Sequence, residues 1–423
     1  MAASAYFSFC TKTQVAFAQF VRCLTCLAVT FVSTPAVYSQ TADDTATPAL
    51  KLRLETRIRY VNIDEGAKPR NVDVITARAI VGAEVAITPQ LKATFEIIHS
   101  DYLPPQRFNA DPAATTSSYP LLPDPRYTGL NEANVTWTPS LDWSAKLGRQ
   151  SVKVGNERLI SDDNFRHVPL LFDGLLVRGS PFEGSQFSVG QFNRLRTRLG
   201  ETEPMQLTVM ELAMNPLRDM SVAAYAMRHR PFARQSDVFR FGVADLSSWV
   251  VGAVVDGSYR FGNMRTYYTL EAAQQRSTRD ESALSVRYLR AGLGVGWKGW
   301  IVRADHEIKG SNGGRYGMQT PLTNQYAFNG NALVFFDTPA TGLRDTWATL
   351  RWEQGPWSAL GEYHTFRADF GNQRYGQEFD ANVTYTINPR AYVRAQWARY
   401  RPAEGGLRTE IDKLWLTVGY EFK

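Results

Sequence analysis

The last residues of the chain, Leu414–Phe422, alternate between apolar and mostly polar side chains. The apolar positions are Leu414, Leu416, Val418, Tyr420 and Phe422. Side chains at every second position of a β-strand share a face, so this strand has two faces suited to two different environments. A soluble sheet with one buried face would show the same contrast. The spacing of similar segments along the rest of the chain is therefore the deciding observation.

Eighteen alternating segments follow one another from Leu52 to the C-terminus, and short and long connections strictly take turns between them. The short ones consist of turn-forming residues at Thr88–Gln90, Pro139–Ser140, Pro181–Gly184, Asn215–Pro216, Gly262–Asn263, Lys298–Gly299, Gly355–Pro356 and Asn388–Pro389. The others include Asp64–Arg70, Tyr102–Tyr127, Ser151–Pro169, Pro231–Ser247 and Gly310–Arg344. This arrangement predicts an all-β fold: a transmembrane antiparallel up-and-down β-barrel of about 18 strands, with short periplasmic turns and long extracellular loops.

The N-terminal residues have the features of a secretory signal peptide. Lys12 and Arg22 are its only charged residues, an apolar run covers Leu24–Val32, and Val37 and Ser39 are small enough for a cleavage site. A transmembrane anchor is the alternative, but the apolar run is far shorter than the ~20 residues that span a bilayer. We therefore expect residues 1–39 to be a removed signal peptide, 40–49 a periplasmic segment and 50–423 the barrel.

All three cysteines, Cys10, Cys23 and Cys26, lie in the expected signal peptide. The mature chain would then contain no disulfide or reactive thiol. A lipoprotein signal ending at Cys26 is not expected, because Cys23 and Thr25 occupy the positions where such a signal needs an apolar and a small residue. The net charge of +6 falls by two when Lys12 and Arg22 are removed, so a nucleic-acid partner is not expected.

Tryptophans flank three of the short turns, at Trp137 and Trp143, Trp297 and Trp300, and Trp352 and Trp357. Aromatic residues at strand ends are typical of the girdles that contact outer-membrane lipid at its interface with water. Core aromatics beside ordinary hairpins are the alternative. The agreement of three turns favours the girdle.

The sequence contains no local catalytic or cofactor-binding motif. Its histidines are scattered, without a pair at metal-ligand spacing: His99, His167, His229, His306 and His364. We therefore expect neither an enzyme nor a bound metal or cofactor. A barrel enzyme acting on lipids, with His306 in a pair assembled across strands, is kept as an alternative.

Arginines are concentrated on the face of the strands opposite the apolar one. Charged side chains on the lipid face would cost ~2–4 kcal/mol each near the bilayer midplane, so they are expected to face the lumen. The candidates for the solute path on the strands are Arg53, Arg57, Arg59, Arg78, Arg265, Arg290, Arg303, Arg351 and Arg394. Acidic residues share this face, and pairing within the wall is the alternative role of each arginine. A lumen with several guanidinium forks would attract carboxylates and anionic sugars and repel cations.

Two stretches resemble a known family. One is Gln319–Asp345, with Thr-Pro, Asn-aromatic-Gly, a second Thr-Pro and Gly-Leu-x-Asp; the other joins Gly148-Arg149-Gln150 to Asn156-Glu157-Arg158 and Phe172-Asp173. Both resemble segments of the alginate-export family of outer-membrane proteins. The chain departs from the family at Gln325 and at Ala332-Leu333, where relatives carry His and Ala-Asp.

The resemblance implies export of an anionic polysaccharide through a monomeric 18-stranded barrel in the outer membrane of a Gram-negative bacterium, and it leaves periplasmic export partners open. It also marks Arg149 and Arg158 as constriction or loop-anchoring residues. Alternatively, Arg149 holds the loop Ser151–Pro169 by pairing with Asp162, Asp163 or Asp173.

The expected function is a channel that passes anionic oligosaccharides or polysaccharides, or other organic anions, through an arginine-lined lumen. A general or nutrient-uptake porin is the main alternative. A structural barrel with a plugged lumen is another, since the loop Gly310–Arg344 could form either an outer lid or an inner plug.

Overall fold

The computed structural model describes residues 49–422 except 113, 115, 232–246 and 280–281. The expected signal peptide and nearly all of the expected periplasmic segment lie outside the described residues. Within the described part, no helix is long and apolar enough to cross a bilayer.

Eighteen antiparallel strands make up the described fold. Their bounds are β1 Leu50–Glu65, β2 Val72–Thr88, β3 Leu91–Tyr102, β4 Tyr127–Ser140, β5 Trp143–Gln150, β6 Leu171–Gly179, β7 Ser185–Arg196, β8 Thr202–Leu217, β9 Met220–Pro231, β10 Ser247–Phe261, β11 Met264–Arg279, β12 Ser282–Trp297, β13 Trp300–Lys309, β14 Leu343–Gln354, β15 Trp357–Arg367, β16 Arg374–Asn388, β17 Ala391–Pro402 and β18 Ile411–Phe422. A single turn of 3₁₀ helix, η1 Gln325–Ala327, lies in the β13–β14 loop. The predicted number of strands is confirmed.

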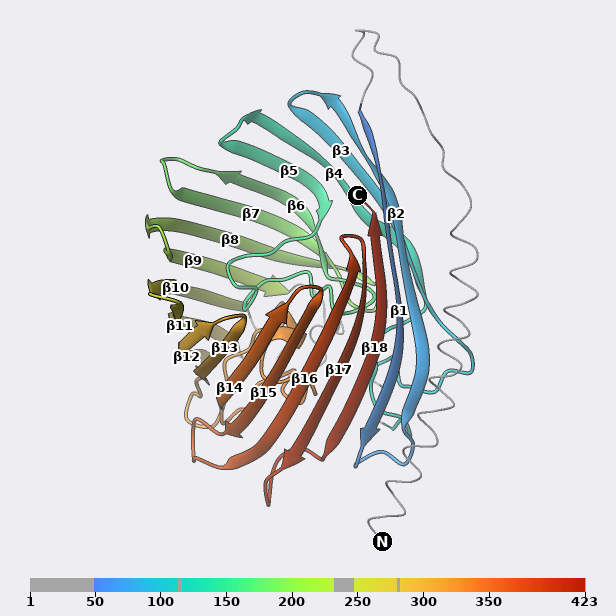
Figure 1. Ribbon diagram of the computed structural model, residues 1–423, viewed down its shortest axis with the longest axis vertical. Coiled ribbons are helices and arrows are strands. Elements are labelled where there is room, and N and C mark those ends of the chain that lie inside the picture. Colours follow the sequence, from blue (N-terminus) through green and yellow to red (C-terminus); the bar gives the residue numbers. More distant parts are fainter. Residues whose placement is uncertain (1–48, 113, 115, 232–246, 280–281, 423) are drawn as a thin grey trace. The chain divides into compact units, whose positions relative to one another are not determined.

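The strands form one closed sheet. Each strand pairs with the next in sequence, and β1 also pairs with β18 in antiparallel register from Leu54 opposite Phe422 to Glu65 opposite Ile411 (Figure 1). The terminal strand predicted from the C-terminal alternation therefore closes the barrel against the first strand. Closure leaves no strand edge with unpaired backbone groups.

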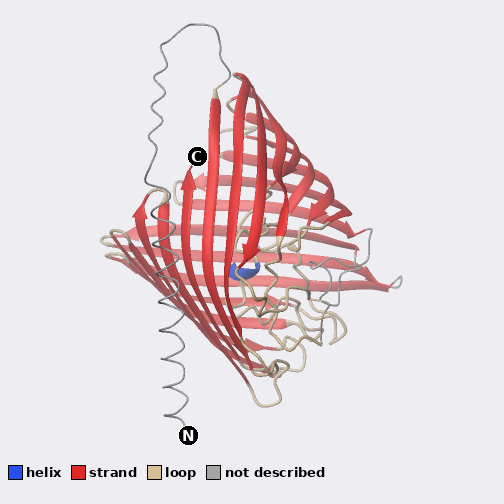
Figure 2. Cartoon of the chain, turned by 90° about the vertical axis from the view of Figure 1, so that its right-hand side faces the viewer, coloured by secondary structure: helices blue, strands red, loops and turns tan. Residues whose placement is uncertain are grey.

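The connections alternate in length with two exceptions. Turns of two to five residues join the strands at one end, and most loops at the other end are longer, among them 103–126, 151–170 and 310–342. Both exceptions are at the loop end: residues 197–201 between β7 and β8 are no longer than the longest turn, and Arg279 at the end of β11 pairs with Ser282 at the start of β12. The prediction of strict alternation is wrong at these two connections, because the strands stay paired up to the ends that they join. Figure 2 shows the loops gathered toward one end, with η1 among them.

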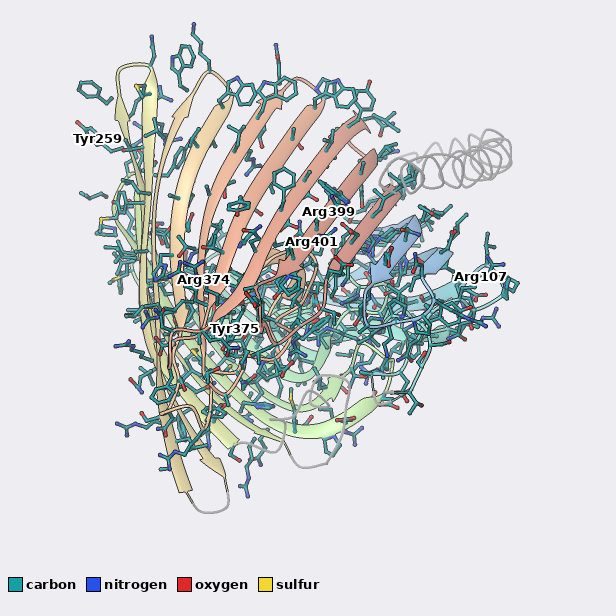
Figure 3. All side chains as sticks on the ribbon, turned by 90° about the horizontal axis from the view of Figure 1, so that it is seen from below. Arg107, Tyr259, Arg374, Tyr375, Arg399 and Arg401 are labelled. Carbon is teal, nitrogen blue, oxygen red and sulfur yellow. The ribbon has the colours of Figure 1, made fainter. Side chains whose placement is uncertain are left out.

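The outer surface of the barrel is apolar and its inner surface is polar. Leu293 on β12 is 65% exposed, whereas Arg290 on the same strand faces the lumen with Asp305 of β13. Trp137, Trp143, Trp297, Trp300 and Trp357 are all exposed at strand ends near the short turns. Figure 3 shows ring side chains along this rim, with Tyr259 on the outside. An apolar outer face with aromatic ends is the surface that a lipid bilayer requires.

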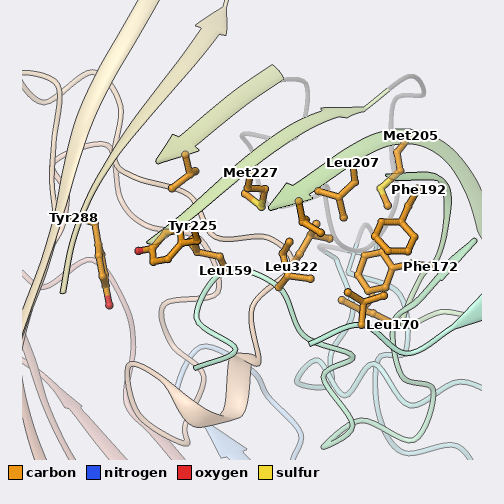
Figure 4. Close-up of a cluster of buried hydrophobic side chains, with 14 of the residues drawn as sticks. Leu159, Leu170, Phe172, Phe192, Met205, Leu207, Tyr225, Met227, Tyr288 and Leu322 are labelled. Carbon is orange, nitrogen blue, oxygen red and sulfur yellow. The ribbon is translucent and has the colours of Figure 1, made fainter. Parts of the chain in front are cut away.

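The buried apolar side chains lie inside the barrel. Figure 4 shows one cluster, in which Leu159 and Leu322 from two loops pack against residues of β6–β9 such as Phe172, Phe192 and Leu207. A second cluster includes Phe335, Tyr400 and Trp415. The core therefore forms where loops fold back onto the inner wall.

Replacing Leu293 by arginine is expected to destabilise the folded barrel by ~2–4 kcal/mol, because a guanidinium would enter the hydrocarbon layer. The same change at Ile387, which is exposed at the turn end of β16, is expected to cost only about 0–1 kcal/mol near the interface. Urea titrations of the refolded protein in lipid vesicles measure both values. Equal losses at the two positions would contradict the assignment of the lipid belt.

Candidate functional site

Two loops enter the lumen and contact each other. In the β5–β6 loop (151–170), Ser161 donates a backbone hydrogen bond to Leu322 of the β13–β14 loop (310–342) at 2.8 Å. In return, Asn324 donates one to Glu157 at 3.1 Å. The segment Gln319–Asp345, which resembles the family signature, therefore folds inward as part of the lumen.

Three arginines of β1 and β2 hold the β5–β6 loop from across the barrel. Arg57 donates to the carbonyl oxygens of Asn164 at 2.7 Å and Phe165 at 3.1 Å, and Arg59 donates to Phe165 at 3.1 Å. Arg78 donates to the side chain of Asn164 at 2.8 Å and pairs with Glu55. All three arginines are buried, so they anchor the loop in this structure.

The start of the same loop is tied to the opposite wall. Arg158 donates to Glu307 of β13 at 2.5 Å and to Asn329 of the other loop at 2.8 Å. Burial lowers the pKa of Arg158, but the Glu307 carboxylate more than offsets this, so the pKa lies above its ordinary value. Arg158 is thus a charged anchor shared by both loops and the wall.

Aromatic rings join the two loops at the centre of this contact. The ring of Phe165 stacks on that of Tyr326 with 3.7 Å between centroids and 11° between planes. Trp415 of β18 meets both rings edge-on, at 5.8 and 5.7 Å. The guanidinium of Arg59 lies 4.3 Å from the centre of the Phe165 ring. The contact between the two loops therefore combines charge pairing with ring stacking.

A cavity of about 500 Å³ lies between the β13–β14 loop and the inner wall of β11–β16. Its lining combines arginines, carboxylates, aromatic rings and amides: Tyr267, Arg290, Arg303, Asp305, Glu307, Tyr326, Phe328, Asn329, Asn331, Trp347, Arg351, Glu362, His364 and Asn382, among others. A cavity with a few polar groups among apolar and aromatic ones is typical of small-molecule sites.

The arginines of this cavity differ in how fully they are paired. Arg303 makes a two-point contact with Asp305 at 2.6 and 2.8 Å, and Arg290 approaches the same carboxylate at 3.3 Å. Two guanidinium groups thus share the Asp305 carboxylate, and Glu307 and Glu362 are the other carboxylates that line the cavity. The side chain of Arg351 is 52% exposed beside Glu353. These three side chains are the predicted arginines that face open space in the cavity.

The remaining predicted arginines belong to separate pairs. Arg149 makes a two-point contact with Asp173 at 2.7 and 2.9 Å, so its partner is the wall aspartate and not Asp162 or Asp163. Arg53 bridges Glu84 and Glu96, Arg265 pairs with Asp219, and Arg394 donates to Thr384. The structure does not bring all the predicted arginines into one ring.

Sequence reasoning missed Trp347, Tyr326 and Asn329, which belong to the cavity or the loop contact. The Asn-aromatic-Gly pattern within Gln319–Asp345 was the signal for two of them, but sequence did not place that loop in the lumen. His306, kept for a lipid-acting enzyme, lies on the outer face and hydrogen-bonds to Thr346 at 2.7 Å.

These features define an 18-stranded transmembrane barrel whose lumen is narrowed by two loops, and solved outer-membrane proteins share this fold. The structure of OpdK of Pseudomonas aeruginosa matches over 88% of this chain and 98% of its own, with a TM-score of 0.66 and 15% identity. A second structure of OpdK, with vanillate, matches with the same values. OccAB1 of Acinetobacter baumannii matches over 88% and 96%, with a TM-score of 0.66 and 12% identity. No model of a known family and no curated protein matches the sequence, so the resemblance to the alginate-export family remains a sequence-based interpretation.

Replacing Phe165 by alanine is expected to raise single-channel conductance, because it removes the ring that joins the two loops. The pair itself is worth ~0.5–1.5 kcal/mol beyond its buried area. Planar-bilayer recording measures the change, and Phe182→Ala, at an exposed position in a short turn, is the matched control. A conductance unchanged in Phe165→Ala would show that this contact does not limit the path.

The loop arrangement is expected to weaken as pH falls. Burial holds the pKa of His167 well below its usual 6.5. The positive charges of Arg59, Arg57 and Arg78 act in the same direction, and Asp124 acts in the opposite one. The imidazole gains its proton near pH 6.5 in the unfolded chain but stays neutral in the fold, so stability is lost as pH falls below ~6.5. Because looser loops obstruct the lumen less, single-channel conductance should rise between pH 7.5 and 5, and His167→Gln should reduce that rise. Equal pH dependence in both proteins would contradict this role.

Proposed function

We propose that this protein is a channel in the outer membrane of a Gram-negative bacterium that passes small organic anions, above all carboxylates, by diffusion. The observation that carries the proposal is the cavity in which Arg290, Arg303 and Arg351 face Trp347 and Tyr326. Guanidinium groups match carboxylates in geometry, and aromatic rings contact the apolar part of a solute. No covalent step is required, and concentration gradients set the direction of net flow.

The two inward loops favour small solutes over long polymers. Their contacts with each other and with both walls occupy the lumen, including the Arg158–Glu307 pair and the Phe165–Tyr326 stack. A rigid polysaccharide would require these contacts to separate, whereas the ~500 Å³ cavity already suits a small molecule. The solved structure of OpdK with vanillate, an aromatic carboxylate, supports this reading by analogy of fold.

Passage of an alginate-like polysaccharide is the second candidate. It is favoured by the resemblance of Gln319–Asp345 to the alginate-export family. Because this segment forms the inward loop, the candidate requires the loop to leave the lumen during transport.

Replacing Arg303 by glutamine is expected to reduce anion selectivity, because Asp305 would then be balanced by Arg290 alone. The matched control is Arg399→Gln, which removes an equal charge from an exposed pair with Asp412. Reversal potentials in a salt gradient should shift toward cation permeability in Arg303→Gln and stay near the wild-type value in the control. Equal shifts in both variants would count against a role for the cavity.

Liposome swelling separates the two candidate solutes. Vesicles containing the protein are expected to swell faster in small aromatic carboxylates than in oligouronates or in neutral sugars of similar mass. The reason is that only a small anion fits the cavity without displacing the loops. Rapid swelling in oligouronates would favour the polysaccharide candidate instead.

A further inference from the structure

A group of acidic residues surrounds one histidine on the wall beside the cavity. Glu362 and His364 of β15 lie opposite Asp380 and Glu378 of β16 in the strand register. Asp345 of β14 contacts the same histidine. All but Glu362 are buried. Four carboxyl groups therefore surround one imidazole on the lumenal wall, and the buried Lys413 interacts with one of them, Glu378.

The imidazole of His364 is held in one orientation. Its Nδ1 lies 3.0 and 3.1 Å from the two carboxylate oxygens of Asp345. Its ring stacks between those of Trp347 and Phe366, each 5.5 Å away with planes within 14°. A carboxylate at Nδ1 places the proton on that nitrogen and turns the Nε2 lone pair toward the opposite side.

The Nε2 atom of His364 is buried, has no hydrogen-bond partner in the described part of the chain, and lies 3.8 Å from Asp380 Oδ2. The Asp380 carboxyl group also interacts with that of Glu378. His364, Asp380 and Glu362 each offer one ligand atom, and the three atoms lie within 4.8 Å of one another. A buried imidazole nitrogen without a partner that faces two carboxyl groups is a candidate ligand for a cation.

The inward loop supports the acidic side of this group. Asn331 donates its backbone N–H to Asp380 at 3.1 Å, and Ala332 donates to Glu378 at 2.6 Å. Gly330, at φ 82°, lets the loop come this close, because a Cβ there would lie 2.5 Å from the Glu378 carboxyl group. The carboxylates are therefore positioned before any ligand binds.

We propose that His364, Asp380 and Glu362 form a binding site for a divalent transition-metal ion, with Zn²⁺ the best match. One imidazole nitrogen with two carboxylate oxygens suits Zn²⁺, whereas Ca²⁺ and Mg²⁺ prefer oxygen ligands alone. Asp345 is then a positioning residue that orients His364. Glu362 and His364 also line the cavity that Arg303 lines.

A bound cation would offset the acidic charge next to the path of an anionic solute. This inference goes beyond the proposed function and does not depend on it, since metal binding is measured without transport. The competing explanation is a protonated His364 shared between Asp345 and Asp380 as an ion pair. That arrangement would not take up a metal ion.

The test is isothermal titration of the refolded barrel, purified with a tag that contains no histidine, with Zn²⁺ at pH 7.5. We expect one Zn²⁺ per chain, and binding at least tenfold weaker in His364→Gln, Asp380→Asn and Glu362→Gln. Asp345→Asn should weaken binding about tenfold through orientation alone. Binding should also weaken below pH 6, because protons compete for the imidazole. Co²⁺ as a probe should give a visible absorption band in the wild type that His364→Gln lacks.

The matched control is His306→Gln, which removes a histidine from the outer face and should bind Zn²⁺ as the wild type does. Heat-modifiable migration on gels confirms that each variant is folded. If the variants at buried positions fail to fold, Glu362→Gln still tests the proposal, because Glu362 lies at the cavity wall and its replacement leaves the buried packing intact. Absence of Zn²⁺ binding in the wild type, or equal binding in Glu362→Gln, would overturn the proposal and favour the ion pair.

Discussion

The satisfaction of backbone hydrogen bonds in lipid is the constraint on which the structure depends. Hydrocarbon offers no partner for an N–H or C=O group, so strands can cross it only as a closed sheet. Pairing of β1 with β18 over twelve residue pairs, from Leu54 opposite Phe422 onward, meets this condition. Closure then assigns every second side chain to lipid and the others to the lumen.

The lumen gathers the charges that lipid excludes, and most of them neutralise one another. Arg57, Arg59 and Arg78 use their charge to hold backbone carbonyls of the β5–β6 loop. Arg303 and Arg290 share a single carboxylate beside the cavity instead. The same residue type therefore serves as a loop anchor in one half of the barrel and as a potential solute contact in the other.

Much of the fold could be predicted from the sequence, and less of the site. Alternation predicted the eighteen strands, and the turn residues predicted that short and long connections take turns, except between β7 and β8 and between β11 and β12. The inward direction of arginines such as Arg290 and Arg303 followed from the same alternation. The partners of Arg158 could not be predicted in this way, because Glu307 and the loop residue Asn329 come close to it only when distant segments fold into one lumen. The contact between Phe165 and Tyr326 had no local signal for the same reason.

The sequence by itself determined which face of each strand contacts lipid, since a period of two is a local property of the chain. Only the tertiary structure decided that two loops fold inward and that Arg158 joins them to Glu307. It also placed His364 among four carboxylates. These outcomes depend on distances between residues far apart in the chain, and the closure of the barrel sets those distances.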